Sequence, residues 1–387
     1  MLSSAIKSFL LGSAAAISLA APAGAATIVL HDIGGAAQVT GTQAEAGFKI
    51  AAKYWESVLT NSATIELNVG YGGLPPGVLG STGSSLIDFV PISSYYALLD
   101  ANKTSALDTL ALANLSPLNG NGGVSALVPA YLAPATSTGI DIAGGTRLAP
   151  DDAINSTLAL TTANVKALGI DLGPSFIDGT IQFSNEFAFD FNPTDGIAAG
   201  TYDFIGVAIH EIGHALGFVS GADDFDYSDG YDGTVDDAWW AYGLDMFRYS
   251  AAGQLNWAPN QASYFSVDGG VTALSGGYFS TGETTGDGNQ ASHWKQPDQA
   301  TPCNDFLGIM NPYICGGKMD SITALDLAAF DAIGWNVSID VLANPAYALT
   351  TAQVYEQFAT PEPATWSVAL LGLFAAGLVT RRRKKQG

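Results

Sequence analysis

The segment HEIGH at residues 210–214 places His210 and His214 four positions apart, with Glu211 between them. Residues i and i+4 of a helix share one face, so both imidazoles can be directed at a single metal ion. Glu211 is then placed to hold a water molecule on that metal and to take its proton. The chain has only four histidines, so this spacing arises rarely by chance. The segment predicts two zinc ligands and a general base.

A third ligand is missing from the local sequence. In the compact form of this motif a His or Asp follows three residues after the glycine, and this chain has Ser220 there. A hydroxyl binds zinc poorly. The two histidines that remain are His31, at the end of the first predicted strand, and His293. Asp223 and Asp224, just beyond the motif, are local alternatives because carboxylates also bind zinc.

The two histidines lie on a predicted helix. Asp203 is a suitable N-cap, residues 204–216 (FIGVAIHEIGHAL) carry the helical pattern, and Gly217 stands where helices commonly end. A glycine at this position lets the chain turn sharply after the second histidine.

Several segments beyond the motif carry the resemblance to a known family. HEIGHALGF, a long following segment, SHW at 292–294 and GIMNP at 308–312 together resemble leishmanolysin-type metzincin zinc peptidases, in which an inserted segment displaces the third histidine. By this resemblance His293 is the third ligand and Met310 belongs to a Met-turn that supports the ligands from below. The chain also resembles PEP-CTERM-tailed bacterial metalloproteases whose last helix ends in a similar DAIGW. The resemblance covers roughly residues 178–335.

The resemblance implies an α+β fold in two subdomains. Residues 26–217 would hold a twisted mixed sheet and the active-site helix, and residues 218–345 a loop-rich part with the insertion, the Met-turn and the final helix. The strand near 179–184 would line the upper rim of the site and pair with an extended substrate. Tyr313 is a candidate oxyanion donor, although its spacing differs from relatives that use a tyrosine, and a packed loop aromatic is the simpler interpretation.

Other elements follow from the pattern of apolar residues. We predict a strand at 27–32, an amphipathic helix at 43–60 and a strand with a following turn within 178–193. A last helix within 320–335 would be capped by Asp320 or Ser321 and would end at Gly334. Residues 346–360 read as a linker.

Both ends of the chain resemble targeting segments. Residues 1–25 combine Lys7 with an apolar run and small residues before Ala26, which predicts a signal peptide. Residues 361–387 begin with PEP, continue with an apolar run and end in a cluster of basic residues, and this pattern resembles the PEP-CTERM sorting tail of bacterial surface proteins. The resemblance implies a membrane-anchored tail, a sorting peptidase as partner, and a body that is exported to the cell surface or the extracellular space.

Charge and cysteine content limit the partners further. The formal net charge is -22, and a surface of this sign repels phosphates, so nucleic acid is not an expected partner. Cys303 and Cys315, the only two cysteines, predict a disulfide in an exported chain, with two zinc-binding thiolates as the rival interpretation. The acidic run after the motif offers carboxylates to Ca²⁺ but lacks the twelve-residue loop pattern, so a solvated acidic loop explains it equally well; the carboxylates are Asp223, Asp226, Asp229, Asp232 and Asp236.

The leading interpretation is therefore a secreted or surface zinc endopeptidase that acts on a protein or peptide, with Zn²⁺ as cofactor and Glu211 as general base. An alternative is a non-catalytic surface or matrix-binding protein that retains the metalloprotease fold, and a zinc hydrolase with another substrate is a third. The intact Glu211 favours an enzyme, because zinc binding alone does not require it.

Overall fold

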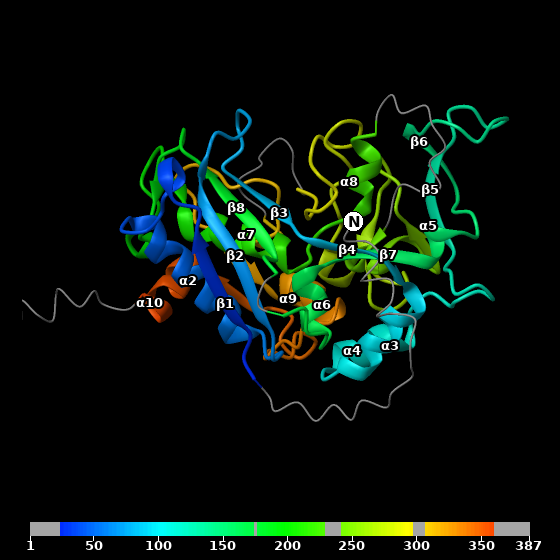
Figure 1. Cartoon of the computed structure of the whole chain (residues 1–387), viewed down its shortest axis with the longest axis horizontal. Coiled ribbons are helices and arrows are strands. Elements are labelled where there is room, and N and C mark those ends of the chain that lie inside the picture. Colours follow the sequence, from blue (N-terminus) through cyan, green and yellow to red (C-terminus); the bar gives the residue numbers. More distant parts are fainter. Residues whose placement is uncertain (1–23, 174–175, 229–240, 297–305, 360–387) are drawn as a thin grey trace, which may run out of the picture.

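The computed structural model describes residues 24–173, 176–228, 241–296 and 306–359, which form a mixed α+β fold (Figure 1). Almost all of the predicted signal peptide and the whole predicted tail at 361–387 lie outside these ranges. Within them, no helix is both long enough and apolar enough to cross a bilayer.

A four-stranded sheet supports the histidine helix. Its strand order is β1 (Thr27–Asp32), β2 (Thr64–Gly72), β8 (Gly179–Ser184) and β3 (Gly80–Ser84). The first three strands run parallel and β3 runs antiparallel at the edge. The crossover that parallel strands require is supplied between β1 and β2 by helix α2 (Gln43–Val58), so the predictions of a strand and a helix at these places are confirmed.

Helices α2 and α7 (Phe204–Leu216) pack together against this sheet (Figure 1). The indole N–H of Trp55 in α2 donates to the carbonyl of Ile209 in α7 at 3.1 Å, so the two helices are joined by a buried hydrogen bond as well as by apolar contact. Phe48 in α2 contacts Phe204 and Phe183, with ring centroids 5.2 and 5.0 Å apart. These contacts fix α7 relative to the sheet.

Two further sheets combine strands from distant parts of the sequence. One has the order β11, β7 and β4, and the other β14, β12, β13, β5 and β6. Both sheets combine strands from the two sides of residue 217, the predicted boundary between the subdomains. Strands β7 and β5 precede this residue, and their partners β11 and β13 follow it. Their bounds are β4 (Leu86–Pro91), β5 (Ala126–Ala130), β6 (Asp141–Leu148), β7 (Thr157–Thr161), β11 (Ala241–Tyr242), β12 (Arg248–Ala251), β13 (Gln254–Asn256) and β14 (Tyr264–Phe265).

Shorter elements connect and cover these sheets. The remaining strands are β9 (Phe189–Asp190), β10 (Tyr202–Asp203), β15 (Ser321–Thr323) and β16 (Ala348–Thr350). The remaining helices are η1 (Gly35–Ala37), α3 (Ile92–Asn102), α4 (Ala106–Ala113), α5 (Ala153–Ser156), α6 (Thr162–Ala167), η2 (Pro193–Asp195), α8 (Gly221–Asp226), η3 (Gly243–Phe247), η4 (Leu274–Gly276), α9 (Ala324–Ala332) and α10 (Thr351–Phe358).

The C-terminal part differs from the prediction in two places. The last helix of the expected catalytic region, α9, is capped by Thr323 and not by Asp320 or Ser321, because residues 321–323 are extended and pair with β16. The predicted linker at 346–360 is wrong for its central part, since β16 and α10 lie there and α10 packs against α2. The predicted end at Gly334 agrees with its φ of +107°, a conformation that glycine adopts readily.

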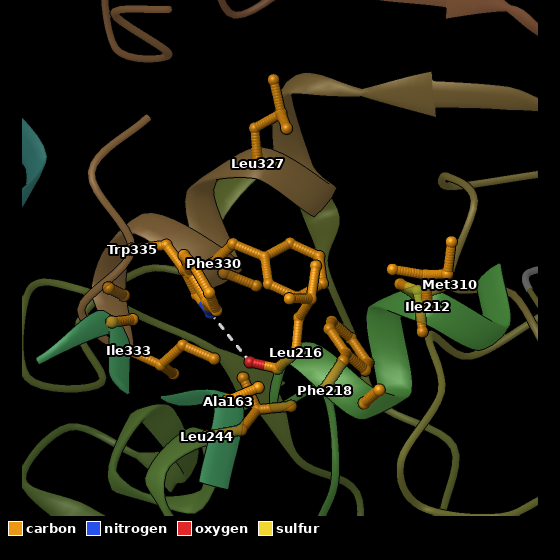
Figure 2. Packing of buried hydrophobic residues seen from close by; sticks show 14 of the residues in the cluster. Ala163, Ile212, Leu216, Phe218, Leu244, Met310, Leu327, Phe330, Ile333 and Trp335 are labelled. Atoms are coloured by element: carbon orange, nitrogen blue, oxygen red, sulfur yellow. Dashed lines mark hydrogen bonds between the residues drawn. The ribbon is translucent and has the colours of Figure 1, made fainter. Parts of the chain in front are cut away.

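The core beneath the histidine helix is dense and aromatic. Figure 2 shows Phe330 in α9 and Trp335, just after α9, beside Leu216 and Phe218 at the end of α7. Trp335 is fully buried, and its indole N–H donates to the carbonyl of Leu216 at 2.8 Å. This bond satisfies one of the carbonyls that the end of a helix leaves without a partner.

Replacing Trp335 with phenylalanine is expected to lower the free energy of unfolding by about 1–3 kcal/mol, because it leaves the buried Leu216 carbonyl unpaired and opens a small cavity. Urea unfolding of the variant measures this loss. Leu342→Ala, at a position that is 36 % exposed, is the control and is expected to change little. An unchanged midpoint for the Trp335 variant would contradict the role of this contact.

Candidate metal centre

Helix α7 begins and ends as its sequence predicts. The side chain of Asp203 accepts a hydrogen bond from the N–H of Gly206 at 3.1 Å, which caps the first turn. At the other end Gly217 has a φ of +121°, and the N–H of Phe218 donates to the carbonyl of Gly213 at 3.1 Å. This is the glycine-terminated turn that closes many helices, and it leads the chain away directly after His214.

Three histidine side chains converge at one point. The Nε2 atoms of His210 and His214 lie 3.0 Å apart, and the Nε2 atom of His293 lies 3.2 Å from each of them. A tetrahedral metal with M–N distances of 2.0–2.1 Å needs its nitrogens about 3.3 Å apart. The three imidazoles therefore fit a small tetrahedral metal ion, and they meet although His214 and His293 are 79 residues apart.

The second ring nitrogen of each histidine fixes its tautomer. The Nδ1 atoms of His210, His214 and His293 lie 2.7, 2.7 and 3.2 Å from the backbone carbonyls of Ile309, Phe218 and Gln290, respectively. A carbonyl oxygen can only accept, so each Nδ1 carries the proton. Every Nε2 then directs a lone pair at the common centre, which is the arrangement of metal-binding histidines.

Burial keeps the imidazoles neutral. Desolvation lowers the pKa of His210 to about 4 and that of His214 to about 3, and it holds the pKa of His293 well below its usual range. Repulsion between the neighbouring imidazoles lowers the pKa of His214 and His293 further. Neutral imidazole is the form that binds metal.

The segment just before His293 is fixed by hydrogen bonds to two buried charged side chains, Asp223 and Arg248. Asp223 in α8 accepts hydrogen bonds from the N–H of Ala291 at 2.5 Å, the N–H of Ser292 at 3.0 Å and the hydroxyl of Ser292 at 2.5 Å. Arg248 donates to the carbonyl of Ala291 at 3.4 Å. Asp223, an alternative third ligand from the sequence, is thus engaged with the loop that carries His293.

Asp223→Asn is expected to weaken metal binding by about 10–100-fold, the usual cost when a group that orients a ligand is lost. Its amide cannot accept all three of these hydrogen bonds without presenting a donor to another donor. Competition with a chromogenic chelator measures the change in affinity. Asp331→Asn, another buried carboxylate that contacts Ser105, is the control. Equal affinity in both variants would remove Asp223 from the site.

Met310 lies against the helix between the two histidines. A Cβ atom on Gly213 would come within 2.6 Å of the Met310 Sδ, so the glycine in HEIGH permits this close contact. Asp326 in α9 holds the turn by accepting the N–H groups of Ile309 at 2.9 Å and Met310 at 3.2 Å. It also accepts the indole N–H of Trp294 at 2.8 Å, so one carboxylate joins the methionine turn to the residue after His293.

Glu211 faces the edge strand β3. Its Oε2 accepts a hydrogen bond from the hydroxyl of Thr82 at 2.7 Å, and a Cβ atom on Gly80 would lie 2.6 Å from its Oε1. Burial raises the pKa of Glu211 to about 7, and the Thr82 hydrogen bond opposes this shift. A carboxyl group with a pKa near neutrality can both accept and return a proton.

A cleft of about 630 Å³ opens over the histidines. It is lined by the segment 75–82, which ends in β3, by α7 and by residues that flank His293 and Met310. Tyr313 also lines it and is 40 % exposed, so it is not the packed loop aromatic that the simpler interpretation expected. The prediction that the strand at 179–184 pairs with substrate is wrong. This strand is β8, and both of its edges are already paired, with β2 on one side and β3 on the other.

The other candidate residues lie elsewhere. The Nε2 atom of His31 lies 2.6 Å from a carboxylate oxygen of Glu66 on the neighbouring strand, away from the three histidines. Ser220 caps α8 and donates to Asp245 at 2.6 Å, which explains a serine at this position. Asp224 accepts the hydroxyl of Tyr242 at 3.1 Å.

The candidate calcium and disulfide residues are described only in part. Asp226 accepts the N–H groups of Thr284 and Thr285, so its carboxylate anchors a loop; Asp229, Asp232 and Asp236 lie outside the described residues. Cys315 is disulfide-bonded. Cys303 lies outside the described residues.

Sequence reasoning did not find Thr82, Asp223 as a support, or Asp326. The sequence TALD at 323–326 could have indicated Asp326, because it matches a capping box. In the structure the Asp326 carboxylate accepts a hydrogen bond from the N–H of Thr323. Thr82 lies in the short polar strand GSTGS, which carries no hydrophobic pattern.

Comparison with known proteins adds no further assignment: no family model, curated protein or solved structure matches the chain.

Proposed function

We propose that the protein is a zinc-dependent endopeptidase of the metzincin type, with His210, His214 and His293 as ligands and Glu211 as general base. The observation that carries this proposal is the convergence of three unprotonated Nε2 atoms beside a buried carboxylate at one cleft. Three nitrogen ligands and an open fourth position are typical of catalytic zinc, whereas structural zinc sites have four protein ligands.

Zinc bound by these imidazoles would supply a Lewis acid for the substrate carbonyl and lower the pKa of an attacking water. Glu211 takes a proton from that water and returns it to the leaving amine, as its pKa of about 7 allows. Thr82 orients the Glu211 carboxylate through Oε2 and leaves Oε1 for this proton. Tyr313, exposed in the same cleft, is a candidate donor to the oxyanion.

The edge strand β3 offers a binding site for an extended peptide. The N–H of Ser184, in β8, donates to the carbonyl of Leu79 at 2.8 Å, and the N–H of Ser85 donates at 2.9 Å to the carbonyl of Asp178, which directly precedes β8. By the alternation of an antiparallel pair, the N–H and C=O groups of residues 80, 82 and 84 point away from β8. A substrate strand can therefore pair with β3, whose residues 80–82 line the cleft.

Digestion of an unfolded protein tests the proposal. The purified protein, loaded with one equivalent of zinc, is incubated with reduced casein, and new termini are identified by mass spectrometry. We expect cleavage at internal peptide bonds, which a non-catalytic binding protein or a hydrolase of another bond does not produce. A zinc-loaded, folded protein that leaves casein intact would refute the peptidase function and favour the binding protein.

A further inference from the structure

One end of the cleft contains a buried carboxylate that the proposed reaction does not use. Asp320 lines the cleft together with Gly206 and Val207 from the first turns of α7, and only 4 % of its surface is exposed. Its Oδ1 accepts a hydrogen bond from the N–H of Ser321 at 2.8 Å. Among the described residues no side chain donates to this carboxylate, so its remaining acceptor sites are left for a group in the cleft.

The surroundings of Asp320 are negative. Asp203 is fully buried beside it, with the Asp203 Oδ2 3.4 Å from the N–H of Asp320. Asp203 is already engaged by the N–H of Gly206 and the hydroxyl of Thr351. Burial raises the pKa of Asp320 well above its usual range, and the charge of Asp203 raises it further. A cation placed beside the pair would favour the ionised form of Asp320 and lower this pKa.

The cleft that Asp320 lines also offers apolar contacts for a long basic side chain. Val207, Pro312 and Ile314 line this cleft with apolar atoms, and no lysine or arginine is among its described lining residues. Lys and Arg bury an apolar stem while their charged head binds a carboxylate. A cleft with apolar residues and one buried carboxylate therefore matches the two parts of such a side chain.

The position of Asp320 relates this end of the cleft to the reacting bond. A Cβ atom on Gly206 would lie 3.1 Å from the Cβ of Asp320, so Asp320 packs against α7 at that residue. Gly206 precedes the ligand His210 by one helical turn, a rise of about 6 Å. This separation suits the side chain of a substrate residue next to the bond that is cleaved.

We propose that Asp320 makes the enzyme prefer peptides with Lys or Arg next to the scissile bond. This specificity rests on the proposed peptidase function and names the substrate class for that cleft. The recognition is an ion pair between the substrate cation and Asp320, supported by apolar contact of the stem with Val207 and its neighbours.

Paired peptides test the specificity. Once a cleavage site in casein has been mapped, two peptides are made that differ only in the residue next to the scissile bond, lysine in one and norleucine in the other. Norleucine keeps the stem and lacks the ammonium group. We expect kcat/KM for the lysine peptide to be higher by about tenfold or more, and Asp320→Asn to bring the ratio close to one.

Glu283→Gln is the matched control, because Glu283 also lines the cleft but is bound by the hydroxyl of Tyr227. We expect this variant to keep the lysine preference. An equal loss of preference in both variants would assign the effect to the general charge of the cleft and overturn the role of Asp320.

The wild-type ratio decides the matter even if Asp320→Asn does not fold. Cleavage of both peptides at equal rates would overturn the specificity while leaving the peptidase function intact. Absence of any cleavage by the zinc-loaded protein would instead reject the peptidase function on which the specificity rests.

Discussion

His293→Ala is expected to reduce zinc affinity by more than about 100-fold and to abolish peptide cleavage. Loss of a residue that merely orients a ligand costs about 10–100-fold in affinity, and loss of the ligand itself should exceed this. The reason is geometric, since the His293 Nε2 lies 3.2 Å from the Nε2 atoms of both other histidines and no other described side chain completes the cluster. Metal analysis after dialysis against a zinc buffer measures the change.

His31→Ala is the matched control, because it removes the one histidine that lies outside the cluster and contacts Glu66 instead. Full zinc content in this variant is expected. If the His293 variant also kept one tightly bound zinc, the third ligand would have to be sought elsewhere, with Asp223 and Asp224 as the nearest carboxylates in the sequence.

Glu211→Gln is expected to retain zinc and to lower kcat by about 10²–10⁴-fold, the range that a positioned general base contributes. Glutamine keeps the shape of the side chain and can still accept the hydroxyl of Thr82, so the helix and the three imidazoles should stay in place. An amide cannot accept the proton of the attacking water. The measurement is kcat for a fluorogenic peptide, made together with zinc content on the same sample.

Two controls give this result its meaning. Thr82→Val removes the hydroxyl that orients Glu211 and should lower kcat by a smaller factor than Glu211→Gln. Equal activity in wild type and Glu211→Gln would exclude Glu211 as the base, and loss of zinc in the variant would show that it supports the metal site instead.

Local sequence rules predict the histidine helix well. Its cap at Asp203, its length and its end at Gly217 agree with the structure, because each depends on hydrogen bonds or backbone angles within a few residues. The strand at 27–32 and the helix that follows it agree for the same reason, since their apolar residues recur at the period of the element.

The supports of the site could not be found in this way. Asp223 meets Ser292 across 69 positions and Thr82 meets Glu211 across 129, and no local pattern encodes such contacts. The edge position of β3 depends on sheet order, which follows from packing of the whole chain. The resemblance placed His293 beside the helix. In the structure the segment before His293 is held there by hydrogen bonds that the backbone of Ala291 makes with Asp223 and Arg248.

Capping at the start of α9 shows a conflict between local and distant preferences. Asp320 and Ser321 are good N-cap residues, yet residues 321–323 pair with β16 and the helix begins three residues later. The paired residues of β16 lie 25 or more positions away in the sequence, outside the reach of a local pattern. Asp320 is thereby left at the cleft, where the proposed specificity uses it.

Removal and return of zinc test whether a metal held by the three histidines is required for peptide cleavage. The purified protein is stripped with a chelator, its metal content is determined, and its cleavage of casein is followed while zinc is added back. We expect no cleavage without metal and activity that rises in proportion to bound zinc up to about one equivalent. Undiminished cleavage by the metal-free protein, or none by the fully loaded and folded protein, would show that the protein is not a zinc-dependent peptidase.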